Sequence, residues 1–237
     1  MQKLPTDHDE NLRVIALKKY AILYSERDVR FDRVAKIAAQ ICQTSMAAVT
    51  FVDEDQTWLK AKVGLRANQL PRNETFCTKT ILANEVLVVN NALYDDRFKN
   101  LKIVVNEPNL RFYAGAPLIT SDGHRIGVVC VFSTEPKELL AAQTVALKSL
   151  AKQVINILDM KSYYKKLCTN GYDQMDLLLA IESLQEELIY NSFYSTFYNM
   201  TQDIQHEINN PLAIVLGRAE LLKLTLHKKT HNEIIRT

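Results

Sequence analysis

In two stretches near the start of the chain, apolar residues recur at three- and four-residue steps, the period of an amphipathic helix. The first stretch, residues 11–24, keeps this period only roughly. The second, residues 31–42, keeps it throughout, with apolar positions at Phe31, Val34, Ile37, Ala38 and Ile41. The pattern predicts a helix over each stretch, and the second helix has a clear apolar face.

The pattern then changes to the two-residue alternation of β-strands. Residues 47–52 form an apolar run, a polar turn follows, and residues 58–63 alternate between apolar and polar. The faces of this second run carry Leu59, Ala61 and Val63 on one side and Trp58, Lys60 and Lys62 on the other. The two runs predict a hairpin.

Two further strands are predicted over residues 112–119 and 126–132, and the Asp-Gly pair between them is a hairpin turn signal. Shorter elements are expected before them: a helix over 75–84, a strand over 86–89 and a short helix around Arg97. Together these elements predict an α+β fold over about residues 11–158, in which helices flank a single antiparallel sheet of about five strands.

From about residue 138 onward the pattern is helical, and no proline lies between Pro136 and Pro211. One apolar stripe consists of Leu147, Leu150, Val154, Ile157 and Leu158. A later series has the four-three-four spacing of a coiled-coil seam and consists of Leu177, Ile181, Leu184 and Leu188. The spacing resumes at Phe193 after a step of five, where a coiled coil changes its winding. The pattern favours a homodimer seam; the alternative is two helices packed on the globular domain.

The net charge, the apolar segments, the cysteines and the glycines of the chain argue against several classes of function. The net charge of +2 argues against general nucleic-acid or membrane-surface binding. No segment approaches the ~20 apolar residues that span a bilayer, and the polar start lacks a signal peptide's apolar core, so a cytoplasmic location is expected. The four cysteines include no C-x-x-C pair and are expected to be reduced. The six glycines form no phosphate-binding loop.

Several motifs along the first two thirds of the chain resemble those of GAF domains. They are FVDED at 51–55, WLKAKVGL at 58–65, FC at 76–77, DDRF at 95–98, LRFYAGAPL at 110–118 and DGHRIG at 122–127. The resemblance covers about residues 10–160. It implies a sheet with helices on both sides and a small-molecule pocket on one face.

The resemblance leaves the ligand of that pocket open. The signatures of cyclic-nucleotide-binding and bilin-binding GAF domains are missing from the sequence. Cys77 is expected to be a packed thiol, with a reactive thiol as the alternative, and Trp58 a partly buried aromatic rather than a pocket edge. His124 is expected in a solvated turn, which argues against haem binding. Many GAF domains serve as dimerisation and relay modules without a known ligand, and this is the default expectation.

A second resemblance covers residues 195–237. The sequence HEINNPL at 206–212 matches the phosphoacceptor box of sensor histidine kinases at every named position. Imidazole is a good nucleophile near neutral pH, and Glu207 beside His206 is placed to act as its proton acceptor and general base. In the family, the position of Asn210 orients water for removal of phosphate from the receiver domain. Pro211 is expected to bend the helix just above the histidine.

These resemblances suggest the input half of a two-component histidine kinase. His206 would accept phosphate from ATP and pass it to an aspartate of a response-regulator receiver domain. The kinase's ATP-binding domain is not found, so no cofactor is expected in this chain, ATP and Mg²⁺ are expected only with that domain, and the chain alone is expected to be inactive. The expected organisation is a tail over 1–10, a GAF domain over 11–160, a signalling helix over 161–194 and a partial histidine-phosphotransfer domain over 195–237.

Three alternatives stay open for the C-terminal part. Asn210-Pro211 is also an ordinary helix start, which would leave His206 in a loop. The chain could instead be a non-catalytic GAF ligand-binding and dimerisation module, or could accept phosphate in trans from a separate kinase. His227 and His231 have a metal-compatible spacing, but no carboxylate or cysteine completes a site, so no metal is expected.

Overall fold

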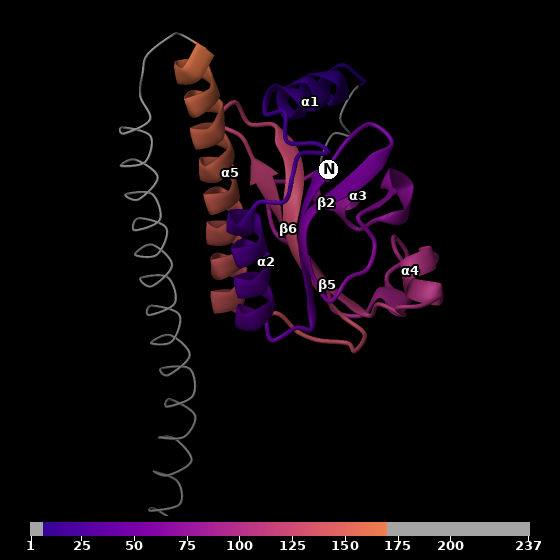
Figure 1. Ribbon diagram of the computed structural model, residues 1–237. Helices are drawn as coiled ribbons and strands as arrows, with labels where there is room; N and C mark the ends of the chain where they lie inside the picture. The colour runs from indigo at the N-terminus through magenta and orange to yellow at the C-terminus, as the bar shows by residue number, and fades with distance from the viewer. Residues whose placement is uncertain (1–6, 170–237) are drawn as a thin grey trace, which may run out of the picture. The chain divides into compact units, whose positions relative to one another are not determined.

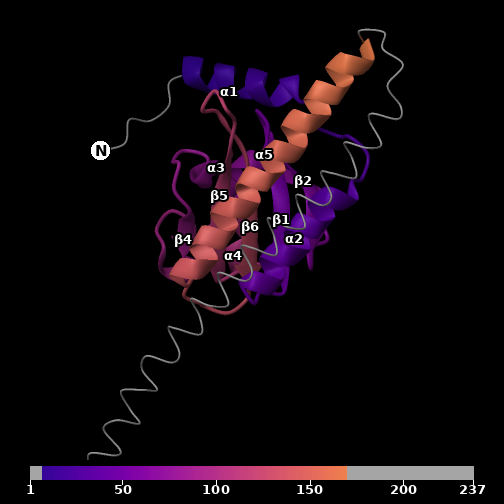
Figure 2. The ribbon, with the colours of Figure 1, turned by 90° about the vertical axis from the view of Figure 1, so that its left-hand side faces the viewer.

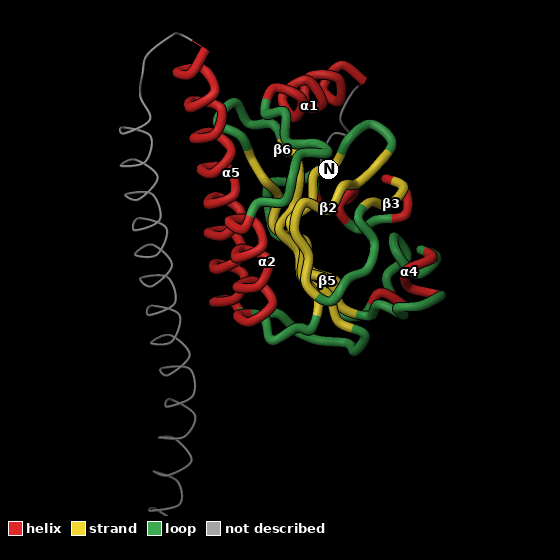
Figure 3. Tube along the Cα trace, in the orientation of Figure 1, coloured by secondary structure: helices red, strands yellow, loops and turns green. Residues whose placement is uncertain are grey.

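The computed structural model describes residues 7–169 of the 237-residue chain. Figures 1 and 3 show the arrangement of its helices and strands. The elements, in chain order, are α1 (Asp7–Lys19), α2 (Val29–Ile41), β1 (Met46–Val52), β2 (Gln56–Val63), β3 (Gln69–Pro71), η1 (Arg72–Glu74), α3 (Cys77–Thr80), β4 (Leu87–Val89), η2 (Ala92–Tyr94), α4 (Lys102–Val105), β5 (Phe112–Ile119), β6 (Arg125–Ser133) and α5 (Ala141–Thr169).

The six strands form one antiparallel sheet in the order β3-β2-β1-β6-β5-β4. The two hairpins predicted from the sequence, β1–β2 and β5–β6, meet where β1 pairs with β6, so the strands farthest apart in sequence form the centre of the sheet. The register places Ala48 opposite Cys130 and Thr50 opposite Val128. Because side chains alternate across a strand, these residues point to one face together.

Helices α2 and α5 cover one face of the sheet, and α3 and α4 lie on the other (Figures 1 and 2). Phe51 of β1 faces α2, where its ring meets Phe31 edge-on at a centroid distance of 6.3 Å. The neighbouring residues of β1 on either side, Thr50 and Val52, point to the opposite face. This alternation gives the domain two apolar layers, one under α2 and α5 and one under α3 and α4.

The start of α2 is tied to α5 through one carboxylate. Asp28 caps α2 by accepting a hydrogen bond from the Arg30 backbone N–H, as an N-cap residue should. The same side chain pairs with Lys161 of α5 at 2.5 Å. Burial raises the pKa of Asp28, but hydrogen bonds from Arg30 and Lys161 outweigh it and hold that pKa below its usual range. The carboxylate therefore stays charged and links the two helices.

The predicted α+β fold with an antiparallel sheet is confirmed, and the details differ in four places. The sheet has six strands rather than about five, because the three-residue strand β3 carries too short a pattern to be recognised. The helix predicted over 75–84 is confined to α3, and the short helix expected near Arg97 is α4 instead, a few residues later. The first helix begins earlier, at Asp7.

The apolar stripe predicted from Leu147 to Leu158 is buried on α5. The coiled-coil seam predicted from Leu177 onward lies outside the described residues, and a long coiled coil is not shown. Within residues 7–169, no helix has the length and apolar character needed to cross a bilayer.

Candidate functional site: a cavity between the sheet and α3–α4

A cavity of about 480 Å³ opens on the face of the sheet opposite α2 and α5. Strands β1, β2 and β6 form its floor, the segment 64–67 and β3 form one wall, and α4 with the segment that follows forms the other. Its apolar lining consists of Met46, Leu59, Leu65, Leu70, Phe76, Ile103, Pro108, Leu110 and Phe132. This volume lies within the range of about 300–1,000 Å³ typical of small-molecule sites.

The polar groups of the cavity wall already bond to one another. The hydroxyls of Thr57 and Thr75 are 3.1 Å apart, and the Thr75 hydroxyl is also 3.1 Å from the Arg72 carbonyl oxygen. Thr50 Oγ1 lies 3.2 Å from the Val128 carbonyl oxygen. Among the residues that the structure describes, the buried side-chain oxygens without a hydrogen-bond partner belong to Asp53 and Gln56, and neither lines the cavity. The wall therefore offers a ligand few unsatisfied polar groups.

The charged residues that line the cavity, Arg66 and Glu107, are both exposed. No charged side chain in the lining is buried, so the interior has no group to balance a ligand's charge. Burial of an unpaired charge in such surroundings is strongly unfavourable. The electrostatics of the cavity thus suit an uncharged molecule.

A lysine shapes the wall over 64–67. Lys62 Nζ donates to the carbonyl oxygens of Arg66 and Ala67 and to Asn68 Oδ1, at 2.6, 2.9 and 2.7 Å. Gly64 starts the turn with a φ of +68°, and a Cβ there would lie 2.3 Å from the Ser45 carbonyl oxygen. Gly64 turns the chain away from β2, and Lys62 holds the segment 64–67 over the cavity. These roles explain the lysine and the glycine in the Lys-Val-Gly-Leu part of the sequence motif.

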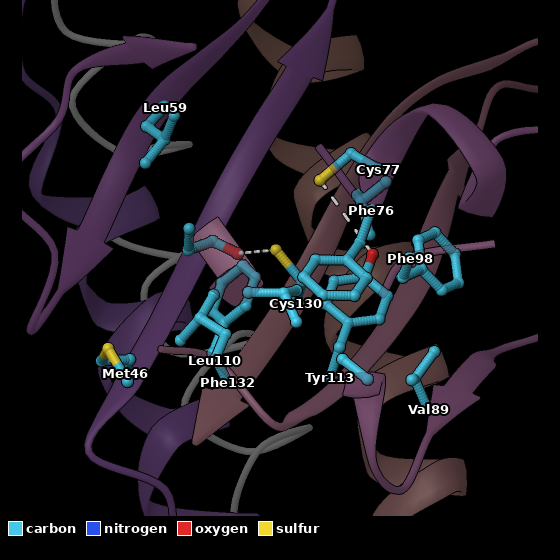
Figure 4. Close-up of a cluster of buried hydrophobic side chains, with 14 of the residues drawn as sticks. Met46, Leu59, Phe76, Cys77, Val89, Phe98, Leu110, Tyr113, Cys130 and Phe132 are labelled. Atoms are coloured by element: carbon cyan, nitrogen blue, oxygen red, sulfur yellow. Dashed lines mark hydrogen bonds between the residues drawn. The ribbon is translucent and has the colours of Figure 1, made fainter. Parts of the chain in front are cut away.

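Phe76 lines the cavity, and it belongs to a cluster of packed aromatic rings (Figure 4). Phe76 stacks on Tyr113 with a centroid distance of 4.6 Å and an interplanar angle of 11°, and Phe98 lies 4.7 Å from Phe76. The Tyr113 hydroxyl is 2.6 Å from Thr80 Oγ1. The Tyr113 ring lies over Gly115, where an added Cβ would be 2.1 Å from the hydroxyl oxygen. The Tyr113 ring can occupy this position because Gly115 has no side chain.

Two cysteines lie beside this aromatic stack (Figure 4). Cys77 begins α3 and lines the cavity, whereas Cys130 lies on β6 and does not. Thr50 Oγ1 is 3.4 Å from Cys77 Sγ, and the Tyr113 hydroxyl oxygen is 4.0 Å from it. A hydrogen bond from the Cys130 thiol lowers the pKa of Cys77, while burial opposes this effect. Burial raises the pKa of Cys130 and of Tyr113.

The residues that the sequence analysis considered in the GAF region lie in different places relative to the cavity. Cys77 is packed, and it also lines the cavity. Trp58 faces away from the cavity, toward Tyr24 and Phe51, at centroid distances of 6.0 and 6.4 Å. His124 lies in the turn between β5 and β6, as expected, with its side chain 27% exposed. Among the described residues, no group of three or more potential ligands could hold a metal ion.

The predicted phosphoacceptor residues, His206, Glu207, Asn210 and Pro211, all lie outside the described residues, and so do His227 and His231. Their proposed roles stay predictions. The cavity residues that sequence reasoning missed are hydroxyl-bearing ones such as Thr50, Thr57 and Thr75. Thr50 lies in an apolar strand on the same face as Ala48 and Val52, and that interruption is the one sequence signal that could have marked it.

The sequence profile of the GAF domain matches residues 26–158, more than half of the chain and the whole of the cavity-bearing sheet. The chain belongs to the GAF-domain family. The first of the two sequence resemblances is thereby confirmed.

Over 233 residues, the chain is 36% identical to a cyclic di-GMP phosphodiesterase of Pseudomonas aeruginosa. The match covers 98% of this chain and 36% of the relative, so the chain spans about a third of that relative's length. It does not support a histidine kinase or a response-regulator partner, and it agrees better with the non-catalytic GAF alternative.

Solved structures with similar folds include the GAF domain of an Acinetobacter phosphoenolpyruvate-protein phosphotransferase. It is 18% identical, with a TM-score of 0.48, and the match covers 66% of this chain and 98% of that one. A free methionine-R-sulfoxide reductase of Neisseria meningitidis is 19% identical, with a TM-score of 0.48 and coverage of 70% and 99%.

Proposed function

We propose that this chain is a non-catalytic sensory module whose GAF domain binds a small, uncharged, mainly apolar molecule in the cavity between the sheet and α3–α4. The lining of that cavity carries the proposal. Its volume suits a small organic molecule, its buried walls are apolar, and its hydroxyl groups already bond to protein partners. A phosphate-bearing ligand would need a cation to balance its charge, and this lining holds no buried one.

A neutral fluorescent compound, N-phenyl-1-naphthylamine, tests this proposal. We expect its emission to rise on addition of the full chain, with saturation at one molecule per chain. Ile103→Trp places a bulky ring in the cavity from α4 and should abolish the rise. Val145 lies on α5 and is 62% exposed, so Val145→Trp is the matched control and should leave the rise in emission unchanged. Equal binding by both variants would place the compound elsewhere and refute the proposal.

Helix α5 is the element through which ligand binding in the cavity would affect an output domain. It packs on β5 and β6 from the side opposite the cavity. Cavity residues such as Phe132 and helix-facing residues such as Val131 alternate on the same strand. A shift of β6 on ligand binding therefore changes the surface on which α5 rests. We propose that α5 passes this change onward in a cytoplasmic homodimer formed through the helical segment.

The output is proposed from the relative. The similar protein from Pseudomonas aeruginosa is named a cyclic di-GMP phosphodiesterase, and this chain matches about a third of it. We propose that the module controls an enzymatic domain of that class. Fusion of the chain to such a domain should make phosphodiesterase activity respond to cavity ligands, and Ile103→Trp should remove the response. Activity that ignores cavity occupancy would count against this role.

A second candidate function rests on the HEINNPL box alone, whose seven residues include every named position of the phosphoacceptor motif. In this proposal His206 accepts a phosphoryl group, Glu207 takes its proton, and Asn210 positions water for dephosphorylation. The test is incubation of the full chain with a histidine-kinase ATP-binding domain and radiolabelled ATP. Acid-labile label that disappears in His206→Gln supports this function, and label retained in that variant rejects it.

A further inference from the structure

Three buried threonines bring hydroxyl groups to the cavity wall, and two of them form a pair. Thr57 of β2 is 1% exposed, Thr75 at the end of η1 is 6% exposed, and both line the cavity. Thr57 and the lining residue Leu59 stand two residues apart on β2, so their side chains point to the same face of the sheet. This pair therefore places oxygen atoms among otherwise apolar neighbours.

The hydrogen bonds of the pair end at one carbonyl group. Thr57 Oγ1 lies 3.1 Å from Thr75 Oγ1, and Thr75 Oγ1 lies 3.1 Å from the Arg72 carbonyl oxygen. The Thr78 hydroxyl and the Thr75 backbone N–H also donate to that carbonyl oxygen. Within residues 7–169, the Thr57 hydroxyl has a single hydrogen-bond partner, the Thr75 hydroxyl. Thr57 is thus the free end of a short hydroxyl chain.

The third threonine, Thr50, is held differently. Its Oγ1 lies 3.2 Å from the Val128 carbonyl oxygen and 3.4 Å from Cys77 Sγ. A carbonyl oxygen can only accept a hydrogen bond, so the Thr50 hydroxyl serves as its donor. The partner of Thr57, in contrast, is a second hydroxyl that can either donate or accept. The hydrogen of Thr57 is therefore the one that can change direction at no loss to the protein.

Two arrangements of the hydroxyl hydrogens satisfy every protein group. In the first, Thr57 donates to Thr75 and Thr75 donates to the Arg72 carbonyl, so the lone pairs of Thr57 Oγ1 can accept from a ligand hydroxyl. In the second, Thr75 donates to Thr57, and the Thr57 hydrogen turns to a ligand carbonyl. The Arg72 carbonyl then keeps its bonds from Thr78 and from the backbone. The pair can thus match either a donor or an acceptor.

We propose that the cavity takes an otherwise apolar molecule with one neutral oxygen, an alcohol or a ketone, and that Thr57 recognises this oxygen. The proposal rests on the proposed ligand-binding function of the cavity and narrows its ligand class. A second polar group on the ligand finds no comparable partner, because the buried side-chain oxygens left without one in the described residues, those of Asp53 and Gln56, do not line the cavity. Burial of such a group without a hydrogen bond is unfavourable.

Three compounds that differ in a single oxygen test this preference. They are 2-ethylnaphthalene, 1-(2-naphthyl)ethanol and 2-acetylnaphthalene, which share one carbon skeleton and carry no oxygen, a hydroxyl and a carbonyl, respectively. Binding to the full chain is measured by equilibrium dialysis, so that no reporter competes for the site. The comparison is made for each compound between the unchanged chain and a variant, because the three compounds differ in their own hydration.

Thr57→Val replaces the hydroxyl with a methyl group of similar size and leaves Thr75 bonded to the Arg72 carbonyl. The alcohol and the ketone should bind about 3- to 10-fold more weakly to this variant, the range that one neutral hydrogen bond accounts for. The ethyl compound should bind at least as tightly as before, which also shows that the variant is folded. Thr57→Ser keeps the hydroxyl and should keep the binding of all three compounds.

Thr50→Val is the matched control, because it removes another hydroxyl from the same lining. It should cause no selective loss of the alcohol and the ketone. Equal changes for all three compounds in Thr57→Val, or the same selective loss in Thr50→Val, would overturn the assignment to Thr57. Ethyl-compound binding that Ile103→Trp abolishes would then still support the cavity as a ligand site. If none of the three compounds binds the unchanged chain, the proposed function fails together with this inference.

Discussion

Replacement of Gly115 by alanine tests the packing behind the cavity. The structure places an added Cβ 2.1 Å from the Tyr113 hydroxyl oxygen, 2.6 Å from its Cζ atom and 2.9 Å from Val128 Cγ1. The tyrosine ring is rigid and lies between β5 and Phe76, so it cannot yield by a small rotation of a flexible end. We expect the ring to leave its position, which costs its contact with Phe76 and its hydrogen bond with Thr80.

The size of the effect follows from those two losses. An aromatic pair contributes about 0.5–1.5 kcal/mol beyond its buried area. A buried hydroxyl left without a partner costs about 1–3 kcal/mol. Together they predict that Gly115→Ala lowers the free energy of unfolding by about 2–4 kcal/mol, in line with other overpacked cores. Urea titration followed by circular dichroism measures this difference. A loss below about 0.5 kcal/mol would refute the reasoning.

Two controls separate the overlap from other causes. Gly123→Ala introduces a Cβ with no atom within 4 Å, so only its φ of +85° opposes the change, and we expect a loss of about 1 kcal/mol. In a Tyr113→Leu background the ring is gone, and Gly115→Ala should cost less than about 1 kcal/mol. An equal cost with and without the ring would show that Tyr113 is not the obstacle.

Three further predictions concern charged groups. Asp28→Ala removes both the α2 cap and the link to Lys161 and should lower the unfolding free energy by about 1–3 kcal/mol, whereas the exposed Asp96→Ala should change it by less than about 0.5 kcal/mol in the same urea titration. Burial raises the pKa of Glu10, but hydrogen bonds from two arginines outweigh it and lower that pKa from 4.5 to about 2. Its contribution, at most about 3 kcal/mol, is therefore complete above pH 4.5 and lost as the pH falls toward 2. Glu10→Gln should flatten the fall in stability between pH 5 and pH 3, and an unchanged fall would contradict the assignment. Lys62→Met frees the segment over 64–67 and should weaken N-phenyl-1-naphthylamine binding several-fold with little change in stability, and unchanged affinity would remove this role from Lys62.

The sequence was sufficient for the long elements of the fold because each has its own periodicity. The hairpins β1–β2 and β5–β6 and the helices α2 and α5 were all predictable from apolar spacing. It was insufficient for β3, α3 and α4, which are three or four residues long and show less than one full period of either pattern.

The candidate site was less predictable than the fold. The GAF resemblance implied a pocket on one face, and Cys77 was expected to be a packed thiol, with a reactive thiol as the alternative. Which strand face bears the pocket depends on long-range pairing, because the cavity residues Met46 and Phe132 come together only through the β1–β6 register. The role of Gly115 likewise depends on how the Tyr113 side chain lies along its own strand. No local spacing contains that information.

The most direct test of the central claim is methyl NMR of the full chain with N-phenyl-1-naphthylamine. Isoleucine and leucine methyl groups report on both faces of the sheet. We predict that the largest shift changes fall on Leu59, Ile103 and Leu110, which line the cavity, and that Leu147 and Leu150, buried on α5, change less. Changes confined to α5, or no saturable change at the cavity residues, would contradict ligand binding between the sheet and α3–α4.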